Sequence, residues 1–336
     1  MPNRAKPLVV TCGEPAGIGI EIAAMAWIAL HNDPSKCFFL ICDTKDFEAR
    51  CTLAGCNVPF AKISAPAEAG AIFADALPIL QRSFAARSEP GVINLENSPM
   101  VMEMIAEAAK LCIAGKASGL VTCPINKDAL YGAGFKFQGH TDYLAAIARE
   151  EGLQADDVMM LVGGGLRAVP VTVHIPLAAV PAALTTAAIV TQGRIVAAAL
   201  TRYFGIEAPR LAVTGLNPHA GENGAMGKED QSIIAPAVAQ LRALGIEVQG
   251  PLPADTAFHA EARATYDAIL CMYHDQALIP VKTLDFHGGI NVTLGLPFIR
   301  TSPDHGTAFG LAGKGTARPG SLIAAITLAA DMASRA

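Results

Sequence analysis

The sequence predicts an α/β protein built from two domains or lobes. Short apolar runs, among them residues 7–12, 37–42 and 268–272, have the length of buried strands, and several are followed by stretches with helical spacing. The hydrophobic fraction of 52% and the charged fraction of 16% are typical of a protein with a large packed core. A chain of 336 residues is also longer than a single core usually organises.

Charge and hydropathy argue against several classes of function. The formal net charge is −5 and no Lys/Arg cluster occurs, so nucleic acid is not the expected partner, and an anionic substrate would need a local site. No apolar run has the length of a membrane-spanning helix, and the N-terminal residues enter a strand too early for a signal peptide. Eight cysteines without a CxxC pair indicate reduced thiols and a cytoplasmic location.

The first elements are a strand over 7–12, a Gly-rich turn over 13–19 and a helix from Glu21 onward. A strand, a glycine turn and a helix N-terminus together form a potential anion site, because free N–H groups and the helix dipole converge there. The spacing matches neither the dinucleotide fingerprint nor a P-loop. Tight packing of the strand against the helix explains the glycines equally well.

The rest of the first half contains further strand and helix patterns. A strand over 37–42 precedes a helix that ends near Gly55, residues 63–97 read as strands and turns, and a helix runs from about 99 to 115. After a strand over 118–123, His140 and Thr141 lie at the N-terminus of another helix. Thr141 or Asp142 would serve there as a cap, whereas His140 has no such structural explanation.

The second half of the chain also alternates predicted strands and helices. The predicted elements are a strand pair, 158–162 and 168–174, around Gly163–Gly165; a helix over 184–204; a strand over 210–214; a helix over 231–244; a strand over 268–272; and a terminal helix over 322–332 that packs on the first lobe.

Three strands of this half are followed by a histidine: His174, His219 and His274. One such residue is usually a core or loop side chain, but three at equivalent strand ends point to a shared role. Three neutral imidazoles suffice to hold one divalent ion and leave positions open for a substrate. The sequence therefore predicts a metal site.

The stretch 271–307 carries Lys282, Asn291, Arg300 and His305, separated by Gly, Pro and Thr. We expect these charges on turns, where they would line an anion pocket, while 291–300 is apolar enough to pack. Asp255 lies on a further loop bounded by prolines.

Six segments of the chain resemble, in order, those of the 4-hydroxythreonine-4-phosphate dehydrogenases. They are GEPAGIG (13–19), GHTDYLA (139–145), GLNPHAGE (215–222), PLPADTAF (251–258), YHDQ (273–276) and NVTLGLPFIRTSPDHGTA (291–308). The resemblance extends from residue 8 to about 325. It departs from the family at VTCPINK (121–127), where Asn126 replaces a histidine, and at His287; neither is a ligand position.

This resemblance implies a two-lobed α/β/α fold like that of the isocitrate and isopropylmalate dehydrogenases, with an active-site cleft between the lobes. Residues 1–135 plus 303–336 would form the first lobe, and 136–302 a second lobe with the metal ligands and the dimer interface. It implies a homodimer whose active site is shared between the subunits. One divalent ion (Zn, Co or Mg) would be held by His174, His219 and His274. Substrate contacts would be His140, Thr141, Lys282, Asn291 and Arg300.

The implied reaction is NAD-dependent oxidation of 4-phosphooxy-L-threonine, followed by decarboxylation to 3-amino-2-oxopropyl phosphate, in pyridoxal 5'-phosphate biosynthesis. NADP is the alternative cofactor, and the residues that contact it are not assigned, since the chain has no Rossmann fingerprint. Asp255 and Lys282 are the candidate catalytic bases. Two alternatives are a relative acting on 4-phospho-D-threonate or 4-phospho-D-erythronate, and a metal-dependent enzyme without redox chemistry.

Overall fold

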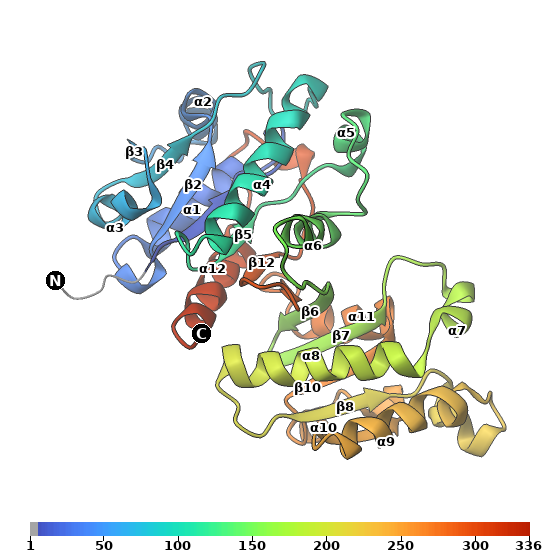
Figure 1. Ribbon diagram of the computed structural model, residues 1–336. Helices are drawn as coiled ribbons and strands as arrows, with labels where there is room; N and C mark the ends of the chain where they lie inside the picture. Colours follow the sequence, from blue (N-terminus) through green and yellow to red (C-terminus); the bar gives the residue numbers. More distant parts are fainter. Residues whose placement is uncertain (1–5) are drawn as a thin grey trace. The chain divides into compact units, whose positions relative to one another are not determined.

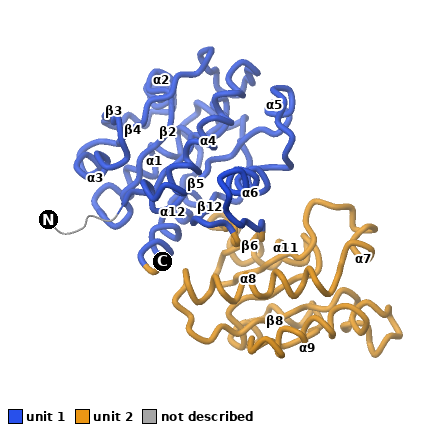
Figure 2. The backbone as a smooth tube through the Cα atoms, in the orientation of Figure 1, with its two compact units in different colours: residues 1–157, 296–334 blue, residues 158–295, 335–336 orange. Residues whose placement is uncertain are grey.

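The computed structural model describes residues 6–336 and divides into two compact units, shown in Figure 2. Unit 1 comprises residues 1–157 and 296–334, and unit 2 comprises residues 158–295 and 335–336. The predicted α/β class is confirmed, since each unit combines strands of a sheet with helices (Figure 1).

Unit 1 contains strands in the order β3-β4-β2-β1-β5-β12, and their pairings are all parallel. The strands are β1 Leu8–Thr11, β2 Phe38–Cys42, β3 Phe60–Ile63, β4 Leu77–Gln81, β5 Leu120–Thr122 and β12 Arg300–Pro303. The helices are α1 Gly19–Leu30, α2 Thr44–Ala54, α3 Ala69–Ile72, α4 Ser98–Ile113, α5 Lys127–Gly132, α6 His140–Glu150 and α12 Gly320–Ala333. Strands β1 and β2 are buried along their whole length, as expected for a parallel sheet covered on both faces.

Unit 2 contains strands in the order β11-β6-β7-β10-β8-β9. The predicted hairpin is confirmed: β6 and β7 are antiparallel, as are β11 and β6, while β7, β10, β8 and β9 pair in parallel. The strands are β6 Val158–Gly163, β7 Leu166–Thr172, β8 Arg210–Thr214, β9 Glu247–Leu252, β10 Ala268–Tyr273 and β11 Ile290–Leu294. The helices are α7 Val180–Ala183, α8 Thr186–Phe204, α9 Ala235–Ala243, α10 Ala260–Arg263 and α11 His274–Leu284.

The boundaries of the units differ from the predicted ones. Residues 136–157 and 296–302 belong to unit 1 rather than to the second lobe. Helix α6 packs on α4, and the Tyr143 hydroxyl donates to the carbonyl of Met102 at 3.3 Å. The rings of Phe135 and Phe137 cluster around Tyr143. These aromatic contacts bury the apolar side of α6 within unit 1. The terminal helix α12 also packs in unit 1, as predicted.

The Gly-rich turn 13–19 serves close packing. A Cβ atom on Gly19 would lie 2.0 Å from the Cys12 carbonyl oxygen, and one on Gly13 would lie 2.3 Å from that of Pro124. The buried side chain of Arg50 holds the turn by donating to the carbonyls of Gly17 (2.7 Å) and Pro15 (2.9 Å). The packing interpretation of this turn therefore explains its glycines.

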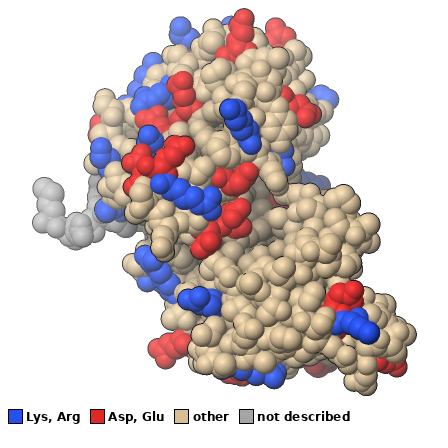
Figure 3. All heavy atoms as spheres, turned by 45° about the vertical axis from the view of Figure 1, so that its right-hand side comes forward, with Lys and Arg blue, Asp and Glu red and all other residues tan. Residues whose placement is uncertain are grey.

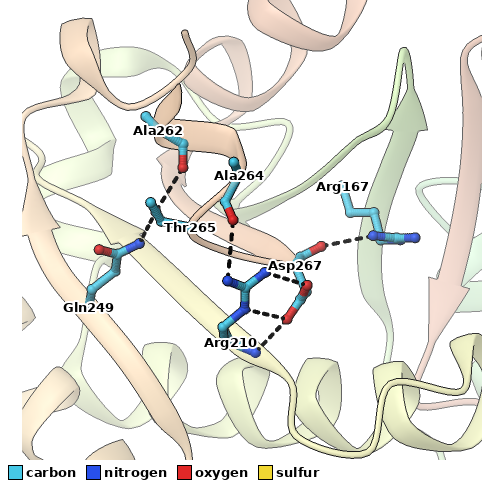
Figure 4. Close-up of polar contacts among 7 residues, drawn as sticks. All are labelled: Arg167, Arg210, Gln249, Ala262, Ala264, Thr265 and Asp267. Atoms are coloured by element: carbon cyan, nitrogen blue, oxygen red, sulfur yellow. Dashed lines mark hydrogen bonds and ion pairs between the residues drawn. The ribbon is translucent and has the colours of Figure 1, made fainter. Parts of the chain in front are cut away.

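A polar cluster fixes the amino ends of three strands of unit 2 (Figure 4). The Asp267 carboxylate, just before β10, accepts from the Arg210 side chain at 3.1 and 3.2 Å and from its backbone N–H at 2.8 Å. Arg167 of β7 donates to the Asp267 carbonyl at 3.1 Å. Because these contacts set the register of β7, β10 and β8, they also determine which residues meet at the opposite, carboxyl edge.

No single helix within residues 6–336 is long and apolar enough to cross a bilayer. Within the same residues, one bent pair of helices, Leu177–Ala183 and Thr186–Phe204, which meet at 90°, has the length and apolar composition of a span when the two are taken together.

Candidate functional site

The three predicted metal ligands all follow the carboxyl ends of parallel strands in unit 2. In the register of the sheet, Tyr273 of β10 lies opposite Thr172 of β7, and Leu270 lies opposite Val213 of β8. His174 comes two residues after β7, His219 follows β8, and His274 directly follows β10 and begins α11. The prediction that these histidines lie along one edge of the sheet is thus supported by the pairing of their strands.

His174 and His274 lie together. Their ring centroids are 5.7 Å apart, and both line a pocket of about 280 Å³ with Thr172, Tyr273 and Asp275. The His274 Nδ1 atom is hydrogen-bonded to Asp275 Oδ1 at 2.6 Å. When Nδ1 carries the proton, Nε2 presents its lone pair outward, which is how carboxylates orient histidine ligands of metals. This geometry fits two imidazoles on one ion.

His219 lies in a second pocket of about 400 Å³, together with Asn217, Asp255, Tyr273 and Gln276. Tyr273 lines both pockets. Within residues 6–336, no three His, Cys, Asp or Glu side chains gather into one ligand group. The structure therefore brings His174 and His274 together and places His219 in the neighbouring pocket.

Two of the three histidines have a left-handed backbone: φ is 51° at His174 and 53° at His219. Residues 219–223 all have positive φ, although only Gly221 is a glycine. Such a conformation costs roughly 1 kcal/mol or more for each residue with a side chain, and it persists only where the surroundings enforce it. Strain of this kind is typical of functional segments.

Asp230 anchors the segment that leads into the left-handed turn. Its buried carboxylate accepts from the backbone N–H groups of Leu216 (2.8 Å) and Asn217 (3.2 Å) and from the Asn217 side chain (2.9 Å). A second buried residue, Gln276, accepts from the Met272 N–H at 2.6 Å and donates to the Gly215 carbonyl at 2.9 Å. Gln276 thereby ties the end of β10 to the end of β8. Neither residue was singled out from the sequence, although the run D-Q-S following a glycine loop could have drawn attention to Asp230.

Lys282 and Asn291 also belong to unit 2. The expectation that Lys282 lies on a turn is wrong, because it lies in the last turn of α11, where its ammonium group is 5.5 Å from the centre of the Phe286 ring. Pro280 obscured the helix, whose buried face is formed by Ala277 and Val281 at helical spacing. Asn291 lies in β11, and its buried Oδ1 atom has no hydrogen-bond partner.

His140, Thr141 and Arg300 belong to unit 1. His140 and Thr141 are the first two residues of α6, as predicted, and the Asp142 carboxylate accepts from the backbone N–H groups of Gly139 (2.8 Å) and Gln138. Asp142 is therefore the capping residue, and Thr141 is not needed as one. Arg300 is buried on β12 and donates to Thr122 Oγ1 at 2.7 Å. Burial lowers the pKa of Arg300 to about 10.

Known proteins match this chain along almost its entire length. The family model described as pyridoxal phosphate biosynthetic protein PdxA matches residues 35–329. A 4-hydroxythreonine-4-phosphate dehydrogenase from Caulobacter vibrioides is 52% identical, over 98% of both chains. One from Methylorubrum populi is 51% identical, over 100% of this chain and 97% of that protein. The crystal structure of the Klebsiella pneumoniae 4-hydroxythreonine-4-phosphate dehydrogenase is 35% identical, covers 99% of both chains and superposes with a TM-score of 0.87.

Proposed function

The chain belongs to the 4-hydroxythreonine-4-phosphate dehydrogenase (PdxA) family, and we propose that it oxidises 4-phosphooxy-L-threonine with a nicotinamide cofactor in pyridoxal 5'-phosphate biosynthesis. The observation that carries this proposal is the identity of about half of all residues to relatives of that name, along the full chain. We further propose NAD as the cofactor and decarboxylation to 3-amino-2-oxopropyl phosphate as the second step.

A divalent ion is the second part of the proposal, with zinc, cobalt and magnesium as the candidates. His174 and His274 would hold it, and the 5.7 Å between their ring centroids fits two imidazole ligands. When bound, such an ion lowers the pKa of the substrate hydroxyl group and stabilises negative charge on its oxygen. The role of Asp275 would be to keep the His274 proton on Nδ1, so that the lone pair of Nε2 remains available to the metal ion. His219 is the proposed third ligand.

The substrate contacts are proposed for side chains of both units. In unit 1, the Arg300 guanidinium is suited to a two-point contact with a phosphate or carboxylate, beside His140 and Thr141. In unit 2, the Asn291 Oδ1 atom is buried without a partner and would accept a hydrogen bond from a substrate hydroxyl or amine. Lys282 would add a point charge.

Two residues are proposed as proton acceptors for the hydroxyl group. Asp255 shares the 400 Å³ pocket with His219, and Lys282 lies on the helix that begins with His274. Turnover by Asp255→Asn and Lys282→Met variants separates the two. A residue whose replacement leaves turnover near normal is not the base.

We also propose a homodimer with a shared active site, acting in the cytoplasm. Large apolar side chains are exposed on the elements that carry the histidines: Ile175, Leu177, Ile279, Leu284 and Phe286. Figure 3 shows a broad area over the lower part of the molecule without Lys, Arg, Asp or Glu. Such surfaces are typical of subunit interfaces, and the proposed set of His174, His219 and His274 would be shared between the two subunits. All eight cysteines are free thiols, as in a reducing compartment. Sedimentation at nanomolar concentration tests the dimer, and an active monomer would contradict it.

The substrate assignment is tested with a panel. Formation of NADH is followed with 4-phosphooxy-L-threonine and, separately, with 4-phospho-D-threonate and 4-phospho-D-erythronate. Preferential turnover of the amino acid supports the proposal. Preference for one of the acids without an amino group would support the dehydrogenase activity but contradict the proposed substrate.

A further inference from the structure

The family resemblance identifies two basic side chains of unit 1 as substrate contacts, His140 and Arg300. A third basic side chain, Lys127, lies near them. Arg300 pairs with Leu120 in the parallel β12–β5 register, yet its Nη2 atom reaches Thr122 Oγ1 at 2.7 Å. The buried guanidinium therefore points toward the carboxyl end of β5. The chain leaves β5 at this end and runs to Lys127.

Lys127 is positioned by its neighbours. Asn126 caps α5, with its Oδ1 atom accepting from the Ala129 N–H at 2.8 Å, and Lys127 is the first residue of that helix. This gives Asn126, where the sequence departs from the family pattern, a structural role. A Cβ atom on Gly139 would lie 3.6 Å from Lys127 Cε and 3.9 Å from Nζ. The ammonium group thus lies beside the N-terminus of α6, which begins with His140.

This arrangement concentrates positive charge. The N-terminus of a helix repels a cation, so Lys127 lies where the backbone dipole of α6 disfavours it. Within residues 6–336, Lys127 forms no ion pair. The pKa of His140 is held well below its usual range, first by burial and then by the charges of Arg300 and Lys127. The charged groups that act on the His140 imidazole are thus both cations, while the Asp142 carboxylate at the same helix N-terminus is engaged by the N–H groups of Gln138 and Gly139.

His140 has an unused hydrogen-bonding atom. Its Nε2 is buried and has no partner, which costs free energy unless a ligand supplies one. A doubly charged phosphate group would offset the charges of the cations. Its oxygens would also accept a hydrogen bond from the His140 imidazole. One ligand chemistry therefore explains both the charge and the unsatisfied atom.

We propose that Lys127 is a further substrate-binding residue, which contacts the phosphate group of the substrate together with His140 and Arg300. This inference rests on the proposed function insofar as the substrate is a phosphate monoester. It assigns recognition of the phosphate to unit 1, independently of the metal ligands in unit 2.

The test compares Lys127→Ala with Lys136→Ala, which removes the same charge from an exposed site on the same segment. Binding of inorganic phosphate to each metal-free protein is measured by calorimetry at low ionic strength, and KM and kcat are then measured for the phosphorylated substrate. Loss of a charged hydrogen bond predicts phosphate binding weaker by about 10- to 100-fold in the Lys127 variant. KM should rise similarly with little change in kcat, because the contact lies away from the reacting carbon. Lys127→Arg should restore most of the binding.

Equal phosphate affinity in the two alanine variants would overturn the proposal, as would the absence of phosphate binding by the parent protein. The two proposals fail separately. If phosphate binding depends on Lys127 but no substrate reduces NAD, the function is wrong and the anion contact stands. If the parent turns over substrate and Lys127→Ala has an unchanged KM, only the role of Lys127 is lost.

Discussion

The imidazole rings of His174 and His274 lie with their centroids 5.7 Å apart at the carboxyl ends of the paired strands β7 and β10. His174 adopts a left-handed backbone to reach this position, and His274 is oriented by Asp275. Two neighbouring imidazoles, one of them oriented by a carboxylate, are suited to bind one metal ion.

The first prediction concerns this pair. His174→Ala and His274→Ala should each remove bound divalent metal and lower turnover by at least about 100-fold. Mutation of residues that only hydrogen-bond to metal ligands already lowers metal affinity or activity by about 10- to 100-fold. Metal content by elemental analysis and NADH formation are the measurements. His259→Ala is the control, because His259 is exposed and its imidazole is paired with Glu261. Retention of metal and activity by both variants would exclude the pair as ligands.

The second prediction concerns Asp230. Asp230→Ala leaves the N–H groups of Leu216 and Asn217 without their acceptor, and we expect a loss of about 3 kcal/mol in the free energy of unfolding. Metal affinity should fall as well, because the turn that carries His219 loses its support. Urea denaturation measures the stability, and Glu207→Ala, an exposed carboxylate in the same unit, is the control. A variant as stable as this control would contradict the role of Asp230.

The third prediction concerns Arg50, which holds the Gly-rich turn and lies 3.4 Å from Glu21. Both side chains are buried. Arg50→Met leaves the Glu21 carboxylate buried without its cation, and loss of one partner of such a pair costs about 3–5 kcal/mol. Thermal or urea unfolding should show this loss, whereas Lys45→Met on the exposed side of α2 should change little. Similar unfolding midpoints for the two variants would show that the turn does not depend on Arg50.

The fourth prediction concerns pH. Since the pKa of His140 in the folded protein is lowered from its usual 6.5, the unfolded chain binds a proton below that pH while the folded protein does not. Stability should therefore fall as pH decreases below 6.5 and gain nothing from this group above it. His140→Gln should reduce the dependence of unfolding free energy on pH in this window, measured without phosphate. An identical dependence in parent and His140→Gln proteins would contradict the assignment.

The sequence predicted those features that depend on local pattern. Buried strands appear as short apolar runs, and β8 has the predicted bounds Arg210–Thr214. Because parallel strands end at a common edge, the positions of His174, His219 and His274 also followed from the strand pattern. The N-terminal placement of His140 on α6 could be predicted from the glycine before it and Asp142 after it.

Features that depend on tertiary contacts could not be predicted in this way. The membership of α6 in unit 1 depends on the packing of Tyr143 against Phe135 and Phe137. The loop that leads into the left-handed turn at His219 is held by Asp230, whose contacts with Leu216 and Asn217 do not follow from any local pattern. The importance of Lys127 follows only from its approach to Gly139 and from the effect of its charge on His140.

The decisive measurement follows NADH formation from 4-phosphooxy-L-threonine with and without a chelator, beside 4-phospho-D-threonate. We predict turnover of the amino acid substrate that stops on removal of the metal and returns when zinc, cobalt or magnesium is added. Turnover that persists after complete removal of the metal would contradict the metal site. Failure to reduce NAD with either compound would contradict the proposed function itself.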